Sequence, residues 1–386
     1  MVARALLALA VGAVAVVPTA AWLPHIITKG NKLFDSTTGL EFRMKGMAYY
    51  PRPNAGELAG VSNYDWAADE HEAIWTAHIA VLKDLSVNTI RLYSVDPSKS
   101  HDKFMCACSE AGIYVLVGMA APCEDCSVQA LAPPDCYPDA MLTRMQMVYN
   151  AFAVYDNTLA FSVANEPNLV SVSNDNGKVV MPCVKAMIRD IRAYAAGCAT
   201  AMRQVPIGVD VADILPREQW ISYFDCGLED SEYTRSECEY ATTGYSRPLM
   251  FGEFGCNIGA NTVDGFENQR TFYDAKWMNE EEDMTTEIVG GNVFEFTTEI
   301  ANLAGAKKLT KTADAGKYGV GYFQPDDCDN DATTCVFTPY PEYKNLRTAY
   351  TTTANSTLTY DAFTPSRDRI LSCPSAISSE LPTKPD

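Results

Sequence analysis

The chain has 386 residues, of which 47% are hydrophobic and 20% are charged, as is ordinary for a globular protein. Its formal net charge of −19 speaks against nucleic acid and anionic lipid as partners, because both would be repelled. A neutral polymer such as a polysaccharide is compatible with this charge.

The first residues have the pattern of a secretory signal peptide. Arg4 supplies a positive charge, residues 5–17 form an apolar core, and residues 19–21 provide the small side chains of a cleavage site. The core is too short to favour a membrane-spanning helix. We therefore predict that residues 1–21 are a signal peptide and that the protein is secreted.

Strand-like and helix-like segments then alternate along the chain. In order they are a strand at 42–50, a helix at 71–86, a strand at 87–95, a helix at 100–112, a strand at 113–120, a helix at 139–156, a strand at 159–167, a helix at 179–198, and strands at 205–211, 248–256 and 290–299. This alternation predicts an α/β protein with parallel strands, and at this length a single (β/α)8 TIM barrel. A doubly wound sheet is the alternative, but the sequence lacks the glycine-rich phosphate loop that usually follows its first strand.

The C-terminal part differs in composition, because Pro, Thr, Asp and Ser are frequent from about residue 325. We predict a catalytic barrel over residues 22–325 and a loop-rich extension packed on it over residues 326–386. Asn355 opens an N-glycosylation sequon, and we expect it to be modified in a secreted protein. The sequence as given ends without an apolar tail and so carries no lipid-anchor signal.

Thirteen cysteines indicate an oxidising compartment. The odd count leaves at least one thiol free or paired between chains. Cys123 and Cys126 have the spacing of a redox or zinc motif, but no second well-spaced pair accompanies them, which favours a disulfide. We therefore expect neither a metal nor a cofactor.

Two of the predicted strands end in a glutamate, Glu166 after "FSVAN" and Glu253 after "PLMFG". Roughly three strand–helix units fit between them, which places them on strands 4 and 7, where barrels gather catalytic groups. Two carboxylates about 5 Å apart serve glycoside cleavage with retention, and Asn165 could donate to a sugar 2-hydroxyl. A strand-end acid can instead cap a helix or pair with a lysine, but two such acids favour catalysis.

Aromatic residues near strand ends fit a sugar cleft, since sugars stack their apolar faces on rings. Each of them could equally serve core packing. They are Tyr49, Tyr50, Tyr93, Phe294 and Phe296.

Seven stretches resemble, in order, the motifs of the fungal β-1,3-glucanosyltransferases of glycoside hydrolase family 72. They are "FRMKGMAYYPRP", "VNTIRLYSVDPSKSHDKFM", "AGIYVLVGMAAP", "YDNTLAFSVANEPN", "VKAMIRDIRAY", "PIGVDV" and "FGEFGCN". The resemblance implies a (β/α)8 barrel and a retaining enzyme. Such an enzyme cleaves β-1,3-glucan internally and passes the new reducing end to the non-reducing end of another glucan chain.

Carried over by motif, Glu166 is implied as the acid/base and Glu253 as the nucleophile. Asn165 is implied as the amide partner of the acid, and Tyr93 as a donor-site aromatic residue. Arg91 shares a strand with Tyr93, from which we infer that it orients the nucleophile. The other expected substrate contacts are Tyr49 and Phe294. Donor and acceptor are both expected to be β-1,3-glucan, and the protein is expected to act as a monomer in the cell wall or at the outer face of the plasma membrane.

The sequence departs from the family pattern inside the barrel. The family aspartate of the third strand is Gly118 here, and Glu124 or Asp125 would compensate only weakly. The family tyrosine of the last strand is Phe294, so a hydroxyl that would support the nucleophile is lost. Between residues 226 and 248 no sixth strand is visible, and the candidate substitutes for its ring are Tyr240 and Tyr245.

The disulfide pattern implied by the family also shifts. Cys226 is expected to bond with Cys373. Cys256 loses its usual partner, for which Cys238 is the nearest candidate. One family bridge is absent, and an aromatic contact is expected in its place, between Trp75 and Phe104.

Two other functions stay open. A retaining endo-β-1,3-glucanase would use the same glutamates but release only shorter products. A wall-glucan-binding protein with weakened catalysis would account for Gly118, Phe294 and the missing sixth strand, whereas the retained Glu166 and Glu253 favour the glucanosyltransferase.

Overall fold

The computed structural model describes residues 22–51, 65–175, 177–198, 202–226, 234–235, 245–255, 270–297, 318–325, 328, 332–367 and 371–385. The predicted signal peptide lies outside these ranges, as do Cys238, Tyr240 and Cys256. None of the helices in these ranges has the length and apolar character needed to cross a membrane.

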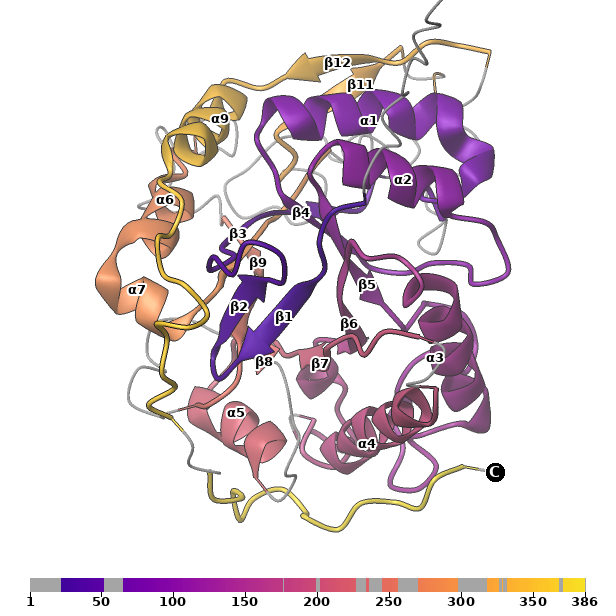
Figure 1. Cartoon of the computed structure of the whole chain (residues 1–386). Helices are drawn as coiled ribbons and strands as arrows, with labels where there is room; N and C mark the ends of the chain where they lie inside the picture. Colours follow the sequence, from indigo (N-terminus) through magenta and orange to yellow (C-terminus); the bar gives the residue numbers. More distant parts are fainter. Residues whose placement is uncertain are drawn as a thin grey trace, which may run out of the picture.

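Eight parallel strands of the described residues close into a barrel, so the predicted fold is confirmed (Figure 1). They are β3 (Met44–Tyr49), β4 (Thr89–Leu92), β5 (Tyr114–Gly118), β6 (Thr158–Asn165), β7 (Ile207–Asp210), β8 (Thr234–Arg235), β9 (Leu249–Phe254) and β10 (Gly290–Val293). Their order follows the chain, and β10 pairs with β3 to complete the circle. Every residue of β5 is buried, which explains its continuous apolar run.

Helices connect successive strands and cover the outside of the barrel (Figure 1). They are α1 (Glu72–Asp84), α2 (Asp102–Glu110), α3 (Asp139–Phe152), α4 (Met181–Gly197), α5 (Arg217–Asp225), α6 (Tyr273–Glu280) and α7 (Glu282–Glu287), with short 3-10 turns η1 (Asp69–His71) and η2 (Pro167–Leu169). The helical spacing of apolar residues in α1 explains its orientation, because one face is buried against the barrel. That face consists of Ile74, Trp75, His78, Ile79 and Leu82.

The sixth barrel strand, β8, has only two residues. It pairs with β7 through Thr234 and Val209, and with β9 through Thr234 and Leu249. A strand therefore exists where none is visible in the sequence, and it is too short to leave a hydrophobic pattern. The suggestion that Tyr245 replaces a site ring is wrong, because Tyr245 is 2% exposed and packs in a core cluster with Leu249 and Phe251.

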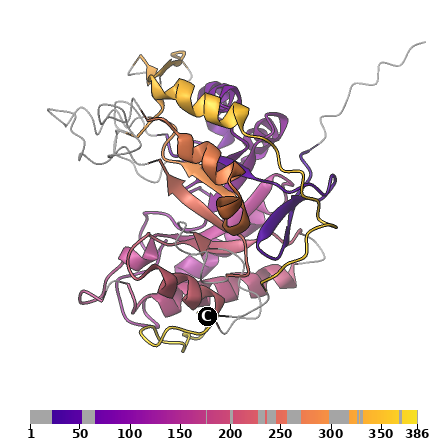
Figure 2. The same cartoon turned by 90° about the vertical axis from the view of Figure 1, so that its left-hand side faces the viewer.

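An antiparallel hairpin of β1 (Ile26–Lys29) and β2 (Lys32–Asp35) covers the end of the barrel where the strands begin. Its Ile26 and Leu33 share a buried cluster with Met44 and Tyr114, at the starts of β3 and β5. Figure 2 shows the hairpin, in indigo, on one side of the barrel. The opposite end, where the strands finish, is therefore the place for a site.

The C-terminal segment is built into the barrel wall. Strands β11 (Gly321–Gln324) and β12 (Val336–Pro339) pair antiparallel and lead to α9 (Glu342–Thr352), so the boundary predicted at residue 325 falls between two paired strands. The Tyr350 hydroxyl donates to the Gly46 carbonyl of β3 at 2.7 Å. Arg270 is 1% exposed, donates to the Gly255 and Phe294 carbonyls at 2.8 and 2.7 Å, and forms an ion pair with Glu342 of α9 at 3.7 Å.

Four disulfides lie within the described residues. Cys226 and Cys373 are bonded, as the family resemblance implied, and Cys123 and Cys126 are bonded, as their spacing favoured. Two further bonds were not predicted: Cys136–Cys183 and Cys328–Cys335. The expected aromatic contact is present, with the rings of Trp75 and Phe104 5.5 Å apart in an edge-to-face arrangement.

Replacing Cys226 and Cys373 by serine should lower the free energy of unfolding by about 5 kcal/mol, because the bond closes a loop with a sequence separation of 147 residues. Replacing Cys123 and Cys126, whose separation is 3 residues, is the matched control and should cost about 2 kcal/mol or less. Urea unfolding of the non-reduced proteins measures both values. Equal losses for the two pairs would contradict the expectation.

A buried histidine lies behind the barrel wall. His78 is 4% exposed, its Nδ1 is 2.7 Å from the Tyr49 hydroxyl, and its ring contacts Phe296 and Phe323. Burial lowers the pKa of His78 from 6.5 to about 3. The imidazole is therefore neutral in the folded protein at any pH above this value.

Acid should destabilise the protein through His78. The unfolded chain binds a proton at His78 below pH 6.5 and the folded chain only near 3, so the free energy of unfolding falls as the pH drops through this window. Between pH 6.5 and 4, His78 lowers the free energy of unfolding by about 3 kcal/mol. His78→Gln should remove this loss of stability, as measured by urea unfolding at several pH values. Parallel curves of stability against pH for the two proteins would contradict the expectation.

Candidate active site

The ends of the barrel strands bring the predicted site residues together. Glu166 directly follows β6, the fourth barrel strand, and Glu253 lies in β9, the seventh. Arg91 lies in β4, and Tyr93 follows directly after that strand. Both glutamates are partly exposed. The separation of their carboxyl groups stays a prediction.

Arg91 connects the ends of four strands. Its Nη1 donates to the Glu253 carboxylate at 2.9 Å and to the Gly252 carbonyl at 3.2 Å. Its Nη2 donates to the Asn165 side-chain oxygen at 2.6 Å and lies 3.0 Å from the Asp210 carboxylate. Because the Arg91 side chain is only 3% exposed, these contacts are poorly screened by water and hold their geometry.

Tyr93 is the second donor to Glu253. Its hydroxyl donates to the same carboxylate oxygen that Arg91 contacts, at 2.5 Å, and its ring lies 4.4 Å from the Arg91 guanidinium. The ring of Tyr50 is 5.1 Å from that of Tyr93. Burial raises the pKa of Tyr93 well above 10, and the neighbouring Glu253 carboxylate adds to this. Tyr93 therefore stays protonated and keeps donating.

Glu166 occupies a turn that few side chains adopt. Its φ is 48° and its ψ is 44°, the left-handed region that is costly for a residue other than glycine. Its N–H donates to the Asp210 carbonyl at 2.7 Å, and its carbonyl accepts from the Leu169 N–H at 2.9 Å. The backbone on both sides of Glu166 is therefore fixed, while its side chain is partly open to solvent.

These contacts give the two glutamates different surroundings. Glu253 accepts hydrogen bonds from a cation and a hydroxyl, which aim one carboxylate oxygen and hold it in place. Glu166 is held through its backbone, and its side chain is partly exposed to solvent. Asn165 uses its oxygen to accept from Arg91, which leaves the amide N–H group as its donor. The arrangement fits an oriented nucleophile beside a proton donor.

Two site residues were missed in the sequence. Asp210 ends β7, is fully buried and pairs with Arg91. It is an acid at a strand end, so the rule that identified the two glutamates also applies to it. Asn292 in β10 is also fully buried, and its amide donates to the Gly252 carbonyl at 3.2 Å. A polar residue inside an apolar strand is the signal that could have identified Asn292.

Tyr49 packs in the core, and its expected sugar contact stays a prediction. Tyr49 is 2% exposed, its hydroxyl lies against His78, and its ring packs on Phe104 and Phe296. Core packing therefore accounts for its aromatic side chain. Phe294 follows directly after β10, is partly exposed, and has its ring centre 5.4 Å from that of Tyr318. A substrate contact of Phe294 stays a prediction.

Gly118 allows the strands beside Tyr93 to approach closely. A Cβ atom placed on Gly118 would lie 2.2 Å from the Tyr93 carbonyl oxygen. This distance is too short for any side chain unless the backbone moves. An aspartate therefore has no room at this position in this backbone. Glu124 and Asp125, the suggested replacements, are exposed in the loop closed by the Cys123–Cys126 bond.

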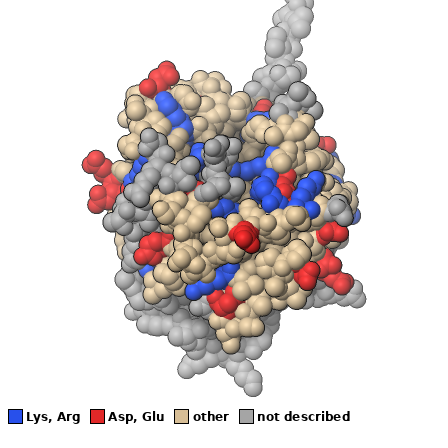
Figure 3. All heavy atoms as spheres, turned by 90° about the horizontal axis from the view of Figure 1, so that it is seen from below, with Lys and Arg blue, Asp and Glu red and all other residues tan. Residues whose placement is uncertain are grey.

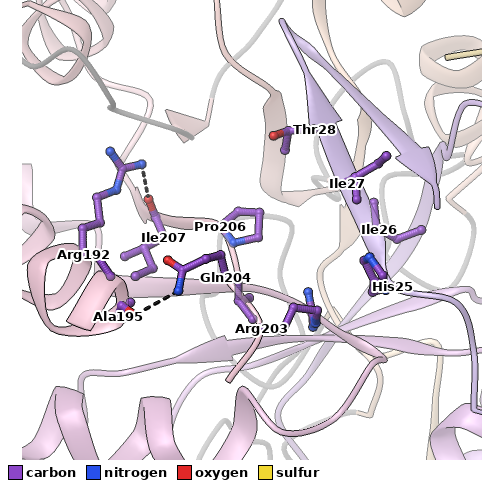
Figure 4. Close-up of a pocket in the computed structure, with 12 residues that line it drawn as sticks. His25, Ile26, Ile27, Thr28, Arg192, Ala195, Arg203, Gln204, Pro206 and Ile207 are labelled. Atoms are coloured by element: carbon purple, nitrogen blue, oxygen red, sulfur yellow. Dashed lines mark hydrogen bonds between the residues drawn. The ribbon is translucent and has the colours of Figure 1, made fainter. Parts of the chain in front are cut away.

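A cavity of about 570 Å³ lies at the other end of the barrel, between β1, α4 and residues 203–207 (Figure 4). Its two arginines are used structurally: Arg192 donates to the Ile207 carbonyl at 3.2 Å, and Arg203 to the Tyr155 and Thr158 carbonyls at 3.1 and 2.6 Å. No carboxylate is among the described residues that line it. We therefore place the candidate site at the strand ends and not here.

The surface charge is mixed. Figure 3 shows acidic and basic side chains interspersed on the face seen from below, separated by uncharged surface. The negative net charge is thus not concentrated in a single acidic patch on this face.

Comparison with known proteins points to one family. The family model described as "Glucanosyltransferase" matches residues 15–317, more than half of the chain. The 1,3-beta-glucanosyltransferase gel1 of Aspergillus fumigatus is 32% identical over 300 residues, which cover 72% of this chain and 60% of that protein. The 1,3-beta-glucanosyltransferase gas4 of Schizosaccharomyces pombe is 32% identical over 294 residues, which cover 71% and 60%. The chain thus spans about 60% of the length of these curated relatives.

A solved structure has the same fold. Gas2p of Saccharomyces cerevisiae, in a glutamate-to-glutamine mutant bound to laminaritetraose and laminaripentaose, superimposes with a TM-score of 0.71 at 26% identity. The superposition covers 94% of this chain and 75% of Gas2p.

Replacing Gly118 by alanine should destabilise the barrel, because the new methyl group would force the Tyr93 backbone away. We expect a loss of about 1–3 kcal/mol in the free energy of unfolding, as for other overpacked sites. Gly197→Ala is the matched control, since Gly197 ends α4 and a Cβ atom placed on it would meet no atom within 4 Å. If urea unfolding shows equal stabilities for the two variants, the close approach at Gly118 does not constrain the barrel.

Proposed function

The chain belongs to the glucanosyltransferases of glycoside hydrolase family 72, and from this premise we propose that it is a retaining β-1,3-glucanosyltransferase. The observation that carries the proposal is the environment of Glu253. This carboxylate accepts hydrogen bonds from Arg91 and Tyr93, and Arg91 also binds Asn165, the neighbour of Glu166. A nucleophile and a proton donor are thus linked through one cation at the open end of the barrel.

In the first proposed step, the Glu253 carboxylate attacks the anomeric carbon of a glucose unit inside a β-1,3-glucan chain. Glu166 gives its proton to the leaving O3, the C1–O3 bond breaks, and the fragment with the original reducing end departs. The remaining fragment is held on Glu253 through its new reducing end. The amide of Asn165 donates to the sugar 2-hydroxyl, a contact that strengthens as the anomeric carbon becomes positive.

In the second step, the 3-hydroxyl at the non-reducing end of another glucan chain attacks the same anomeric carbon. Glu166 takes the hydroxyl proton, and the bond to Glu253 breaks. Two inversions give a new β-1,3 linkage, and the enzyme returns to its starting protonation state. Transfer prevails over hydrolysis when the acceptor chain occupies the site and displaces water.

We place this activity outside the cell, in the cell wall or at the outer face of the plasma membrane. Support comes from the four disulfides of the described residues, which fit an oxidising environment. The proposed donor and acceptor are both β-1,3-glucan, bound by a monomer. Asn355 is exposed just beyond α9, where a glycan would meet no steric obstacle from that helix, and we propose it as a glycosylation site.

Incubation with a laminari-oligosaccharide of defined length, followed by mass spectrometry of the products, tests the proposed function. Products longer than the substrate are expected. Glu253→Gln should abolish them, whereas Glu282→Gln, at an exposed position in α7, is the matched control and should not.

If only products shorter than the substrate form, the protein is an endo-β-1,3-glucanase and not a transferase. An inert wild-type protein that still binds glucan would indicate a wall-binding role in place of an enzyme.

A further inference from the structure

A buried asparagine lies two residues after the proposed acid/base. Asn168 belongs to the short turn η2 and is fully buried. Its Nδ2 donates to the Ala212 carbonyl at 2.8 Å, and its Oδ1 accepts from the Ala212 N–H at 2.7 Å. One side chain thus bonds both the N–H and the carbonyl of a residue two positions beyond β7, whose carbonyl also accepts from the Ile214 N–H at 2.9 Å. The pair of bonds ties the turn after the fourth barrel strand to the loop after the fifth.

The turn is also packed from its other side. Gly177 has a φ of 75°, and a Cβ atom placed on it would lie 2.5 Å from the Asn168 Cα. Gly177 therefore approaches the backbone of Asn168 closely, while the Asn168 side chain bonds Ala212. Neither contact involves the proposed catalytic side chains. Any effect of these two contacts on catalysis therefore has to act through the turn.

The conformation of Glu166 explains why such a restraint is needed. A left-handed backbone is strained at a residue other than glycine and persists only where the surroundings enforce it. The N–H of Glu166 is held by Asp210 before the turn, and its carbonyl is held by Leu169 within it. Asn168 lies between these two points and fastens the turn to a neighbouring strand end.

We propose that Asn168 is a positioning residue for Glu166, which keeps the Glu166 carboxyl aimed at the leaving oxygen of the bound glucan. This inference rests on the proposed function. Release of the Ala212 clamp lets the turn relax and moves the Glu166 carboxyl, while Glu253, held by Arg91 and Tyr93, keeps its place. Loss of Asn168 therefore impairs proton donation and leaves nucleophilic attack intact.

Leaving-group dependence separates this role from simple stabilisation. A laminari-oligosaccharide needs a proton on its leaving oxygen, whereas a 2,4-dinitrophenyl β-laminari-oligosaccharide releases a stable phenolate without one. For Asn168→Ala, kcat/KM on the oligosaccharide should fall by roughly 10- to 100-fold, because small displacements of a general acid are costly. On the dinitrophenyl substrate, kcat/KM should change little, since this constant reports the step in which Glu253 attacks.

Asn157 offers a matched control at the other end of the same strand. It is fully buried just before β6, and its amide donates to the Met105 and Ile113 carbonyls at 3.0 and 3.3 Å. Asn157→Ala should reduce stability, and any loss of activity should be the same for both substrates. If Asn168→Ala fails to fold, Asn168→Asp replaces it in the test, because the aspartate keeps an acceptor for the Ala212 N–H. Asn168→Asp should lose activity on the oligosaccharide and keep it on the dinitrophenyl substrate.

Equal losses on the two substrates for the Asn168 variants, or no loss on either, would overturn the positioning role while leaving the proposed function intact. A wild-type protein inert on both substrates would overturn the proposed function and, with it, this inference.

Discussion

A single buried cation, Arg91, holds the strand ends of the barrel together. It belongs to β4 and contacts side chains or carbonyls from β6, β7 and β9, which are not its sequence neighbours. A buried charge of this kind is stable only when it is fully paired, and its partners are equally costly to leave alone. Asp210 and Glu253 therefore depend on Arg91 as much as it depends on them. The hydrogen-bonding requirement of one guanidinium thus fixes where the Glu253 carboxylate lies.

A second buried arginine extends this arrangement to the rim of the barrel. Arg270 binds the carbonyls that follow β9 and β10 and pairs with Glu342 at the start of α9. The strand that carries Glu253 is thus held from inside by Arg91 and from its end by Arg270. Because α9 lies late in the chain, the C-terminal segment helps to hold the end of the strand that carries Glu253.

Sequence patterns predicted the barrel and the strand positions of Glu166 and Glu253, because periodicity is a local signal. The Cys226–Cys373 bond was implied by the family resemblance and not by any local pattern. Sequence patterns could not predict β8, whose two residues leave no period to detect. They also missed Asp210 and Asn168, whose partners lie far away in the sequence: Arg91 for Asp210, and Ala212 for Asn168. The burial of Tyr49 could not be predicted, because a strand-end ring can point to the core or to the cleft, and only packing decides between them.

The Cys226–Cys373 bond also sets an order of events during biosynthesis. Its two sulfurs are separated by 147 residues, so Cys226 enters the oxidising compartment long before its partner has been synthesised. Until residue 373 arrives, Cys226 has to remain a thiol or pair transiently with another cysteine. The earlier Cys136–Cys183 bond can close once α4 has emerged. The barrel therefore cannot acquire this cross-link until residue 373 has been synthesised, and a chain interrupted earlier keeps Cys226 without this partner.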